Sequence, residues 1–366
     1  GPGQYAALLD ELRANDGTVG PETRRAYALE AFALTAAYDA AIVGWLQCDE
    51  LLPRHLVLPL ERTDETLRYG ENPHQQAARY RRPGVTSWWD GATQHGGLAL
   101  SYLNYYDTDA AWRLVHDLGD QPACAVIKHA NPCGAAVADS LADAYERALA
   151  CDEQSAFGGI VALNRPVDVA TVERMVAGPQ ADVFIAPAYG PGVIEALQAK
   201  RKNTRILEGP PPVADAYEVR QITGGFLVQE AHHFASARDA WRVVTRREPT
   251  ESEWRDLELA WRVCGHVKSN AIVLVKDGQA CGIGAGQQKR VDSAEIAARK
   301  ADGRAVGGAS ASDAFYPFED GIEAAAAAGV AAVIQPGGAM RDESVIARAD
   351  ELGLAMVLTG ERHFLH

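Results

Sequence analysis

The same order of local features occurs twice in this chain, and it limits the fold more than any other feature. In each copy a short apolar run ends at a polar loop, an alanine-rich helix follows, and another apolar run begins at a glycine. The runs that open the two copies are residues 123–127 and 271–275. Continuous apolar runs of this length are typical of buried strands, so the order predicts βαβ units and a partly parallel sheet. We expect two similar α/β blocks, which suggests an ancient duplication.

The rest of the chain differs from these blocks. Residues 1–66 are predicted to form a helical lead-in, in which Pro21 is well placed to begin a long helix. Two α/β subdomains are expected over residues 67–230 and 263–366. Three tryptophans and mixed charges indicate a helical insert between them, over residues 231–262.

Turn and cap residues predict the connections within the blocks. Asp277 and Gly278 form a strong hairpin signal. Residues 131–134 are expected to make the turn after the first apolar strand. Ser140 and Ser293 are each expected to cap the helix that follows.

Charge and cysteine usage exclude several functional classes. The 366-residue chain has a formal net charge of −14, so non-specific binding to nucleic acid or to an anionic membrane is not expected. No apolar stretch is expected to approach the roughly 20 residues of a membrane span. The six cysteines form no CxxC pair and read as reduced thiols, which predicts a cytoplasmic protein.

Lys128 and His129 give the sharpest local signal for catalysis. They follow a buried strand, where α/β sheets place ligands. The positive charge of the lysine favours the neutral imidazole, which can accept a proton near neutral pH. The lysine could also stabilise an oxyanion. The alternative is a solvated basic pair at the end of a strand.

A zinc site is not expected here. His129 and Cys133 match part of the zinc-deaminase signature, which requires H-x-E and P-C-x-x-C. Asn131 stands where the glutamate should be, and Ala136 stands where the second cysteine should be. Two ligands do not make a zinc site, so we predict no metal ligands.

Other loops suggest ligand contacts, each with a plainer alternative. Residues 282–286 lack the strand-to-helix setting of a dinucleotide fingerprint. We interpret them as a flat backbone edge that a ligand approaches, or as an ordinary hairpin end. Arg68, Arg290 and Arg362 could each hold a phosphate or carboxylate, or lie in solvent. Residues 155–159 could bind an anion, although such a run is more often a plain turn.

Taken together, the motifs resemble those of one family, the AICAR formyltransferase half of the bifunctional AICAR formyltransferase/IMP cyclohydrolases. The matching segments, in family order, are residues 67–75, 125–134, 155–162, 269–272, 282–290, 312–320 and 362–366. The resemblance implies two tandem cytidine-deaminase-like α/β/α subdomains without zinc. It also implies transfer of a formyl group from 10-formyltetrahydrofolate to the 5-amino group of AICAR, as a step of purine biosynthesis.

The resemblance also implies roles for particular residues. His129 would accept the proton, and Lys128 and Asn270 would stabilise the transition state. The residues implied to bind AICAR are Arg68, Tyr69, Arg290, Phe315 and Arg362. Those implied to line the folate pocket are Val291, Asp320, Ala339 and Met340. Asn270 and Arg290 would come from the second subunit of an obligate homodimer with shared active sites. The sequence leaves open whether a monovalent cation binds.

Three departures from the family pattern stand out. Ala188 occupies a position where relatives have a glycine that contacts AICAR. No clear counterpart of the family's acidic AICAR-binding residue occurs over residues 208–212, so none is carried over. The cyclohydrolase motifs, which precede residue 27 in the family, are not in this sequence.

Two further hypotheses are weighed against the transferase. A zinc-free nucleotide hydrolase of the deaminase fold would need an activated water, and the sequence offers no second acid or metal to supply one. An acidic oligomeric scaffold could bind purine nucleotides without chemistry. The basic pair beside Asn270 argues against it, because binding alone does not need a tuned base.

Overall fold

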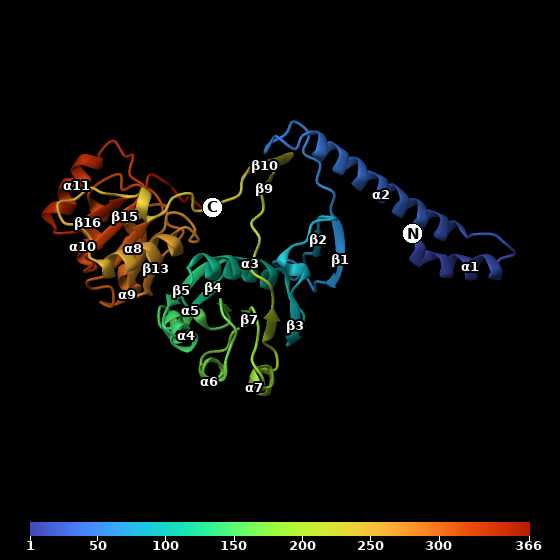
Figure 1. Ribbon diagram of the computed structural model, residues 1–366, viewed down its shortest axis with the longest axis horizontal. Helices are drawn as coiled ribbons and strands as arrows, with labels where there is room; N and C mark the ends of the chain where they lie inside the picture. Colours follow the sequence, from blue (N-terminus) through green and yellow to red (C-terminus); the bar gives the residue numbers. More distant parts are fainter. The chain divides into compact units, whose positions relative to one another are not determined.

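A computed structural model describes residues 1–366, and the chain divides into two compact units. The first unit contains residues 1–65, 79–85 and 214–232. The second contains residues 66–78, 86–213 and 233–366. Figure 1 shows the helices and strands of both units, coloured along the sequence.

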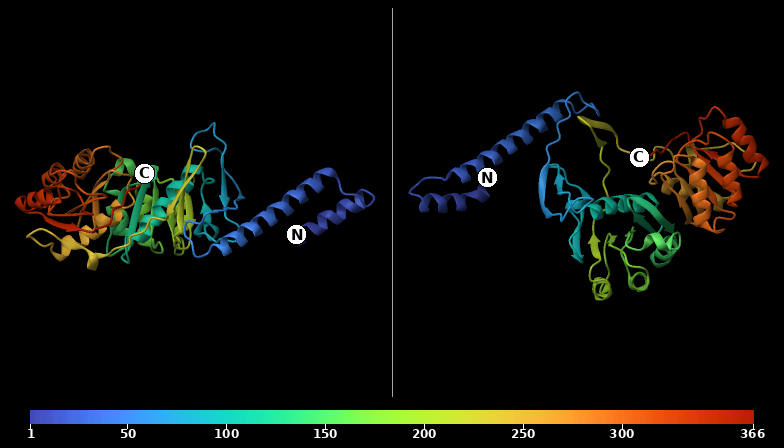
Figure 2. Two further views of the ribbon diagram at one scale, coloured as in Figure 1. Left: turned by 90° about the horizontal axis from the view of Figure 1, so that it is seen from above. Right: turned by 180° about the vertical axis from the view of Figure 1, so that it is seen from behind.

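The first unit consists of helices and two small two-stranded sheets. Its helices are η1 (Pro2–Gln4), α1 (Tyr5–Ala14) and α2 (Pro21–Leu46). One sheet pairs β1 (Glu61–Thr66) with β2 (Ala78–Arg81), and the other pairs β9 (Tyr217–Ile222) with β10 (Gly225–Glu230). Helix α1 folds back beside α2 (Figure 2), and the Glu11 carboxylate accepts a hydrogen bond of 2.8 Å from the Gly20 amide before α2. The long helix predicted to begin at Pro21 is confirmed, whereas none of the four strands was expected.

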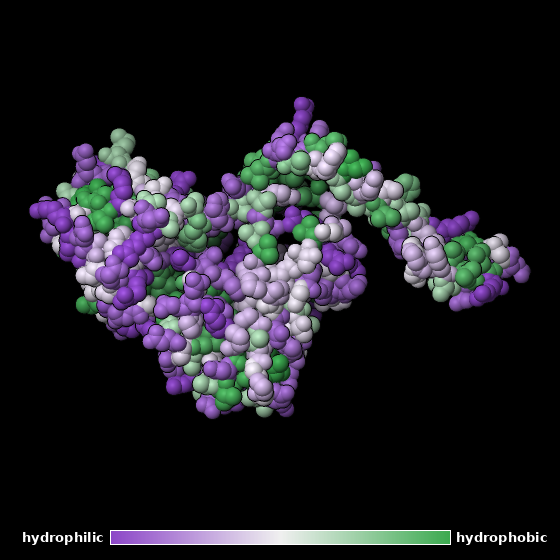
Figure 3. Space-filling view, viewed as in Figure 1, coloured by the Kyte–Doolittle hydropathy of each residue, from purple (hydrophilic) through white to green (hydrophobic).

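Helix α2 is apolar on all sides. Ala40 is its only buried residue, and Leu29, Phe32 and Trp45 are exposed by 70%, 76% and 73%. The space-filling view shows hydrophobic side chains along this helix (Figure 3). By length and composition the helix could cross a membrane, so the expectation that no apolar stretch approaches such a length was wrong. Buried helices of ordinary globular proteins pass the same test, so this property alone is weak support for a membrane span.

The second unit is built on one twelve-stranded sheet with two halves. The first half contains β3 (Thr93–Gly96), β4 (Ala123–Lys128), β5 (Asn131–Val137), β6 (Ile160–Leu163), β7 (Val183–Ala186) and β8 (Arg205–Glu208). The second half contains β11 (Arg242–Val243), β12 (Ile272–Lys276), β13 (Gln279–Gly284), β14 (Ala309–Ser312), β15 (Ala332–Gln335) and β16 (Ala355–Leu358).

The two halves have the same topology. From the centre outward the strand orders are β5-β4-β6-β7-β8-β3 and β13-β12-β14-β15-β16-β11. In each half a central hairpin is followed by an antiparallel neighbour, two parallel pairings and an antiparallel edge strand. The halves join where β5 meets β13, and the Val137 amide donates to the Gly278 carbonyl at 2.9 Å. The predicted pair of similar α/β blocks is therefore confirmed.

Helices cover both faces of this sheet. Helices α3 (Tyr102–Asp117) and α8 (Glu251–Cys264) pack on one face. The opposite face is covered by α4 (Leu141–Leu149), α6 (Val169–Ala177), α7 (Val193–Lys200), α9 (Arg290–Ala301), α10 (Asp320–Ala327) and α11 (Asp342–Glu351). Short helices α5 (Glu153–Ala156), η2 (Trp88–Asp90) and η3 (Arg238–Ala240) lie in connections. Neighbouring side chains on a strand point to opposite layers, as Val126 and Ile127 do on β4, which explains the continuous apolar runs.

Local predictions within the blocks have mixed outcomes. The hairpin at Asp277 is confirmed, and the Ser140 hydroxyl caps α4 by accepting from the Asp143 amide. Residues 131–134 are not a turn but part of β5, because the chain already reverses at residues 129–130. Ser293 is not a cap, since α9 begins three residues earlier and the Ser293 hydroxyl donates to the Asn270 carbonyl.

The range predicted as a helical insert is mostly not helical. Of residues 231–262, only the part within α8 forms an α-helix. This helix holds the place in the second half that α3 holds in the first, because each precedes and covers its central hairpin. The division of the chain at residues 66, 230 and 262 stays a prediction.

Candidate active site

The hairpin of β4 and β5 displays Lys128 and His129 at its end. Lys128 pairs with Asn131, so His129 and Ala130 form a two-residue turn. Both turn residues have a φ of 54°, in the left-handed region, as a type I′ turn requires. Asparagine and glycine usually fill such turns, because most other side chains raise the energy of this conformation. The imidazole of His129 is exposed, which leaves it accessible to a ligand.

The Lys128 ammonium is held by two neutral acceptors. Its Nζ donates to the carbonyl oxygens of Phe157 and Gly158, each at 3.0 Å. An ammonium has three N–H donors, so the geometry leaves one for a ligand. The loop over residues 155–159, considered above as an anion site, thus offers carbonyl oxygens to a cation. It begins with the single turn of α5, which favours the plainer interpretation as a turn.

The carboxylate of Asp107, on α3, accepts a hydrogen bond from the backbone of this turn. Asp107 is 9% exposed, and its Oδ1 accepts a hydrogen bond of 2.9 Å from the Ala130 amide. Burial raises the pKa of Asp107, while the amides of Ala130 and His129 and the nearby Lys128 act in the opposite direction. The site therefore contains a buried acid that binds the backbone of the turn carrying the exposed imidazole.

A hydrogen bond to a side chain connects the turn end of the hairpin with the second half of the sheet. The Lys268 amide donates to Oδ1 of Asn131 at 3.0 Å. Asn131 pairs with Lys128 across the hairpin, and Lys268 lies two residues before Asn270. Segments distant in sequence, from both α/β blocks, therefore meet at this end of the β4–β5 hairpin.

Asn270 and Arg290 form one hydrogen-bonded unit. The Asn270 amide donates to the carbonyl oxygens of Gln287 and Gln288 at 2.9 and 3.0 Å. Its Oδ1 accepts from Nη2 of Arg290 at 2.8 Å. Arg290 is buried and forms an ion pair with Asp313, so it supports Asn270 and does not lie at an open rim.

Asp313 forms hydrogen bonds with several segments that contain predicted site residues. This carboxylate is fully buried and binds Arg290 and the Ser269 hydroxyl, while the Asp313 carbonyl accepts from the His363 amide at 2.9 Å. Phe315 follows two residues later and is 37% exposed. Arg362 precedes His363, is exposed, and lies 4.6 Å from the Phe364 ring centroid. The fold therefore brings Asn270, Phe315 and Arg362 to one region of the second half.

The other predicted ligands are not drawn together by any described contact. Arg68 is exposed and lies 5.4 Å from the Tyr69 ring centroid. Val291 lies in the first turn of α9, and Asp320 begins α10. The amide of Ala339 donates to Asp342 at 3.1 Å, and Met340 is fully exposed. Their roles toward AICAR and folate stay predictions.

Gly282 and Gly284 allow α9 to pack closely, whereas a Cβ on Gly286 would meet open space. A Cβ on Gly282 would lie 2.0 Å from the Ala297 carbonyl oxygen, and one on Gly284 would lie 1.9 Å from that of Ser293. Helix α9 therefore fills the space beside Gly282 and Gly284, and the approach of a ligand to this edge stays a prediction. Gly134 has the same relation to α4 in the first half, with 2.0 Å to the Ala148 carbonyl oxygen.

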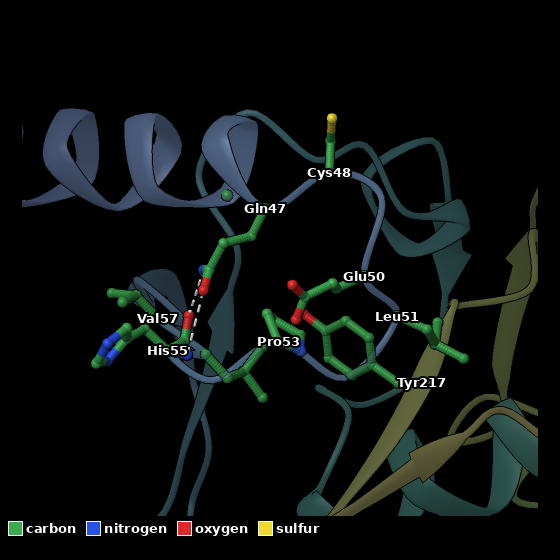
Figure 4. A pocket seen from close by; sticks show the side chains of 10 residues that line it. Gln47, Cys48, Glu50, Leu51, Pro53, His55, Val57 and Tyr217 are labelled. Carbon is green, nitrogen blue, oxygen red and sulfur yellow. Dashed lines mark hydrogen bonds between the residues drawn. The ribbon is translucent and has the colours of Figure 1, made fainter.

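The chain offers no metal centre, and a small cavity lies in the unit that does not contain the hairpin. Across residues 1–366, no group of three or more histidine, cysteine, aspartate or glutamate side chains is placed to hold a metal ion. A cavity of about 190 Å³ lies in the first unit, lined by the end of α2, residues 50–57 and Tyr217 (Figure 4). Pockets for small molecules usually measure about 300–1,000 Å³. None of the predicted site residues lines this cavity, so the hairpin is the better candidate.

Sequence reasoning did not identify Asp107 or Asp313. Both are buried acids that bind other residues of the site. The repeat offered one signal for Asp107. Asp256 on α8 precedes Lys276 at nearly the same spacing by which Asp107 precedes Lys128. The spacing is 21 residues for Asp107 and 20 for Asp256, so an alignment of the two halves with a one-residue gap would pair these two aspartates.

Comparison with known proteins finds similarity over most of the chain. A family model described as AICARFT/IMPCHase bienzyme matches residues 1–300. A relative from Dinoroseobacter shibae, named bifunctional purine biosynthesis protein PurH, is 52% identical over 99% of this chain and 71% of its own length. Relatives with the same name from Cereibacter sphaeroides and Nostoc sp. are 50% and 45% identical, over 99% and 100% of this chain and 71% of their own lengths. The similarity thus extends through both halves of the sheet.

Proposed function

The chain belongs to the AICARFT/IMPCHase bienzyme family, and from this premise we propose that it catalyses formyl transfer from 10-formyltetrahydrofolate to the 5-amino group of AICAR. The products are formyl-AICAR and tetrahydrofolate, in the purine biosynthesis named in its relatives. The observation that carries the proposal is a lysine–histidine pair held at an exposed, left-handed turn in a chain of this family. The proposal includes a cytoplasmic location and two subdomains of the cytidine-deaminase type.

His129 acts as the general base. The AICAR amine is a poor nucleophile, because its lone pair is delocalised into the ring and the carboxamide. Removing a proton from the nitrogen as it attacks the formyl carbon lowers the barrier. The exposed imidazole at the tip of the turn is accessible to this nitrogen, which supports the assignment.

Lys128 stabilises the oxyanion that forms on the formyl oxygen. Two carbonyl oxygens orient its ammonium and leave one N–H donor for the developing charge. Asn270 is the second donor in the proposal. Both hydrogens of its amide are bound to the carbonyl oxygens of Gln287 and Gln288, so it must exchange one of these bonds to reach the substrate. As the tetrahedral intermediate collapses, the bond from the formyl carbon to N10 of the folate breaks, N10 takes up the proton that His129 accepted, and tetrahydrofolate is released.

The remaining assignments concern binding. Arg68, Tyr69, Phe315 and Arg362 hold AICAR in this proposal, and Arg290 contributes by orienting Asn270. Residues Val291, Asp320, Ala339 and Met340 line the folate site. Much of the rate enhancement comes from alignment of the two substrates.

We include an obligate homodimer with shared active sites in the proposal. The apolar surface of α2 supports association, because a helix that is apolar all round is usually buried. The contact between Lys268 and Asn131 places part of the second half beside the hairpin within one chain, so a site formed by a single chain is the competing arrangement. For a natural protein that carries the preceding family domain, the proposal adds IMP cyclohydrolase activity.

The test is an absorbance assay for tetrahydrofolate, with chromatography for formyl-AICAR. The purified chain is incubated with AICAR and excess 10-formyltetrahydrofolate, and the control reaction lacks AICAR. The proposal expects both products to appear in equal amounts, and only when AICAR is present. Formation of tetrahydrofolate without AICAR, or deamination or hydrolysis of the nucleotide, would contradict it and favour a hydrolase.

A further inference from the structure

Asp107 is a buried carboxylate to which the reaction scheme gives no role. It is 9% exposed, and its Oδ1 accepts the Ala130 amide proton at 2.9 Å. Taking a carboxylate out of water is unfavourable unless hydrogen bonds compensate for the lost hydration. The observed bond joins α3 to the turn that carries the proposed base. Asp107 therefore acts on the backbone of the turn.

The turn that Asp107 contacts has an unfavourable conformation. His129 and Ala130 both have a φ of 54°, although each carries a Cβ. Single residues of this kind persist where the surrounding structure holds them, and they occur often at functional sites. The Ala130 amide is fixed by a buried acceptor, which lowers the energy of the left-handed turn relative to other loop shapes.

The second half of the sheet contains the same arrangement without a base. Asp256 on α8 accepts from the amides of Asp277 and Gly278 at 2.9 and 2.8 Å, at the turn of the β12–β13 hairpin. That turn has the sequence Asp-Gly, which adopts a positive φ at little cost. An aspartate from the covering helix thus binds the hairpin turn in both halves, but only the first half needs it to support a less suitable sequence.

We propose that Asp107 is a positioning residue, which holds the His129–Ala130 turn in its left-handed conformation and so directs the imidazole toward the substrate amine. This inference rests on the proposed function, because it needs His129 to take part in a reaction. The carboxylate does not touch the substrate. Its contribution reaches the chemistry through the Ala130 amide and the direction of the His129 side chain.

The experiment compares three substitutions at one position. Asp107→Ala and Asp107→Leu remove the acceptor, and the leucine also keeps the volume of the buried side chain. Asp107→Asn keeps an oxygen that can accept the Ala130 amide proton. We expect kcat to fall about 10- to 100-fold in the first two, because small misplacements of a catalytic group cost that much. The KM for AICAR should stay close to the wild-type value, and Asp107→Asn should recover most of the activity.

Asp256→Ala is the matched control. It removes the same kind of bond from the other hairpin and should lower thermal stability with kcat near the wild-type value. The inference is overturned if folded Asp107→Leu keeps wild-type kcat, if Asp107→Asn is as impaired as Asp107→Leu, or if Asp256→Ala loses as much kcat. A wild-type chain without formyl transfer would instead overturn the proposed function, so the two failures are distinguishable.

Discussion

Replacing Lys128 by methionine removes the charge but keeps most of the volume of the side chain. In the structure the ammonium donates to the carbonyl oxygens of Phe157 and Gly158, both at 3.0 Å. Methionine cannot donate to either oxygen. The substitution therefore has two separable effects, a loss of stability from these bonds and a loss of catalysis from the missing charge.

The structure provides a magnitude for each effect. Hydrogen bonds to a charged group contribute about 1.5–3 kcal/mol each. Lys128 is only half-buried, and water can replace part of this interaction, so we expect the free energy of unfolding to fall by about 1–3 kcal/mol. Losing one donor to a developing oxyanion lowers kcat by about 10²- to 10³-fold. Catalysis should therefore suffer more than stability.

The repeat supplies a matched control in Lys276. Its Nζ donates to the Gly307 carbonyl oxygen at 3.3 Å and pairs with Asp277 at 3.1 Å, beside the other hairpin turn. Lys276→Met should cost a similar amount of stability in urea unfolding and leave formyl transfer near the wild-type rate. The reasoning is refuted if Lys128→Met transfers formyl at the wild-type rate, or if both variants lose kcat equally.

Three further outcomes are expected. In urea titrations, Gly282→Ala should lower the free energy of unfolding by about 1–3 kcal/mol, because α9 fills the space of the new Cβ. The Cβ of Gly225→Ala meets open space, so this variant should change the free energy of unfolding by less than about 0.5 kcal/mol. A thiol reagent near neutral pH should modify only Cys48 in the native chain and all six cysteines after denaturation, because burial raises the pKa of the other thiols, that of Cys133 to about 12. Mass spectrometry counts the adducts, and early reaction of a buried thiol would contradict this expectation. Mixed subunits of His129→Asn and Asn270→Ala should regain activity if sites are shared between chains, and inactive mixtures with proven subunit exchange would favour a site within one chain.

Much of the fold was predictable because strands that are buried on both faces require continuous runs of apolar residues. The runs at residues 123–127 and 271–275 are apolar throughout, since both faces of the sheet are covered by helices. The Asp-Gly turn at residue 277 was found from its residue types alone. The turn at His129 was missed for the opposite reason, because histidine and alanine carry no preference for a positive φ strong enough to indicate a turn. Its conformation depends on Asp107, which lies on another element.

The candidate site was predictable only in its exposed chemistry. Lys128 and His129 stand out as a basic pair after an apolar strand. Arg290 forms hydrogen bonds with both Asn270 and Asp313, which lie far from it in the chain, and no local sequence pattern predicts these bonds. The role of Gly282 also depends on a contact with a distant segment, which the local sequence does not indicate. Its sequence context suggests a ligand, while the fold uses the missing side chain to bring α9 close.

The central claim is that His129 removes the proton from the attacking amine. The most direct measurement is kcat for formyl transfer by His129→Asn, together with its affinity for AICAR by calorimetry. Asparagine adopts a positive φ readily, so the turn keeps its shape, but its amide cannot act as a base. The account predicts that kcat falls by about 10²- to 10⁴-fold while AICAR binds with nearly unchanged affinity. A folded variant that transfers formyl at the wild-type rate would contradict it.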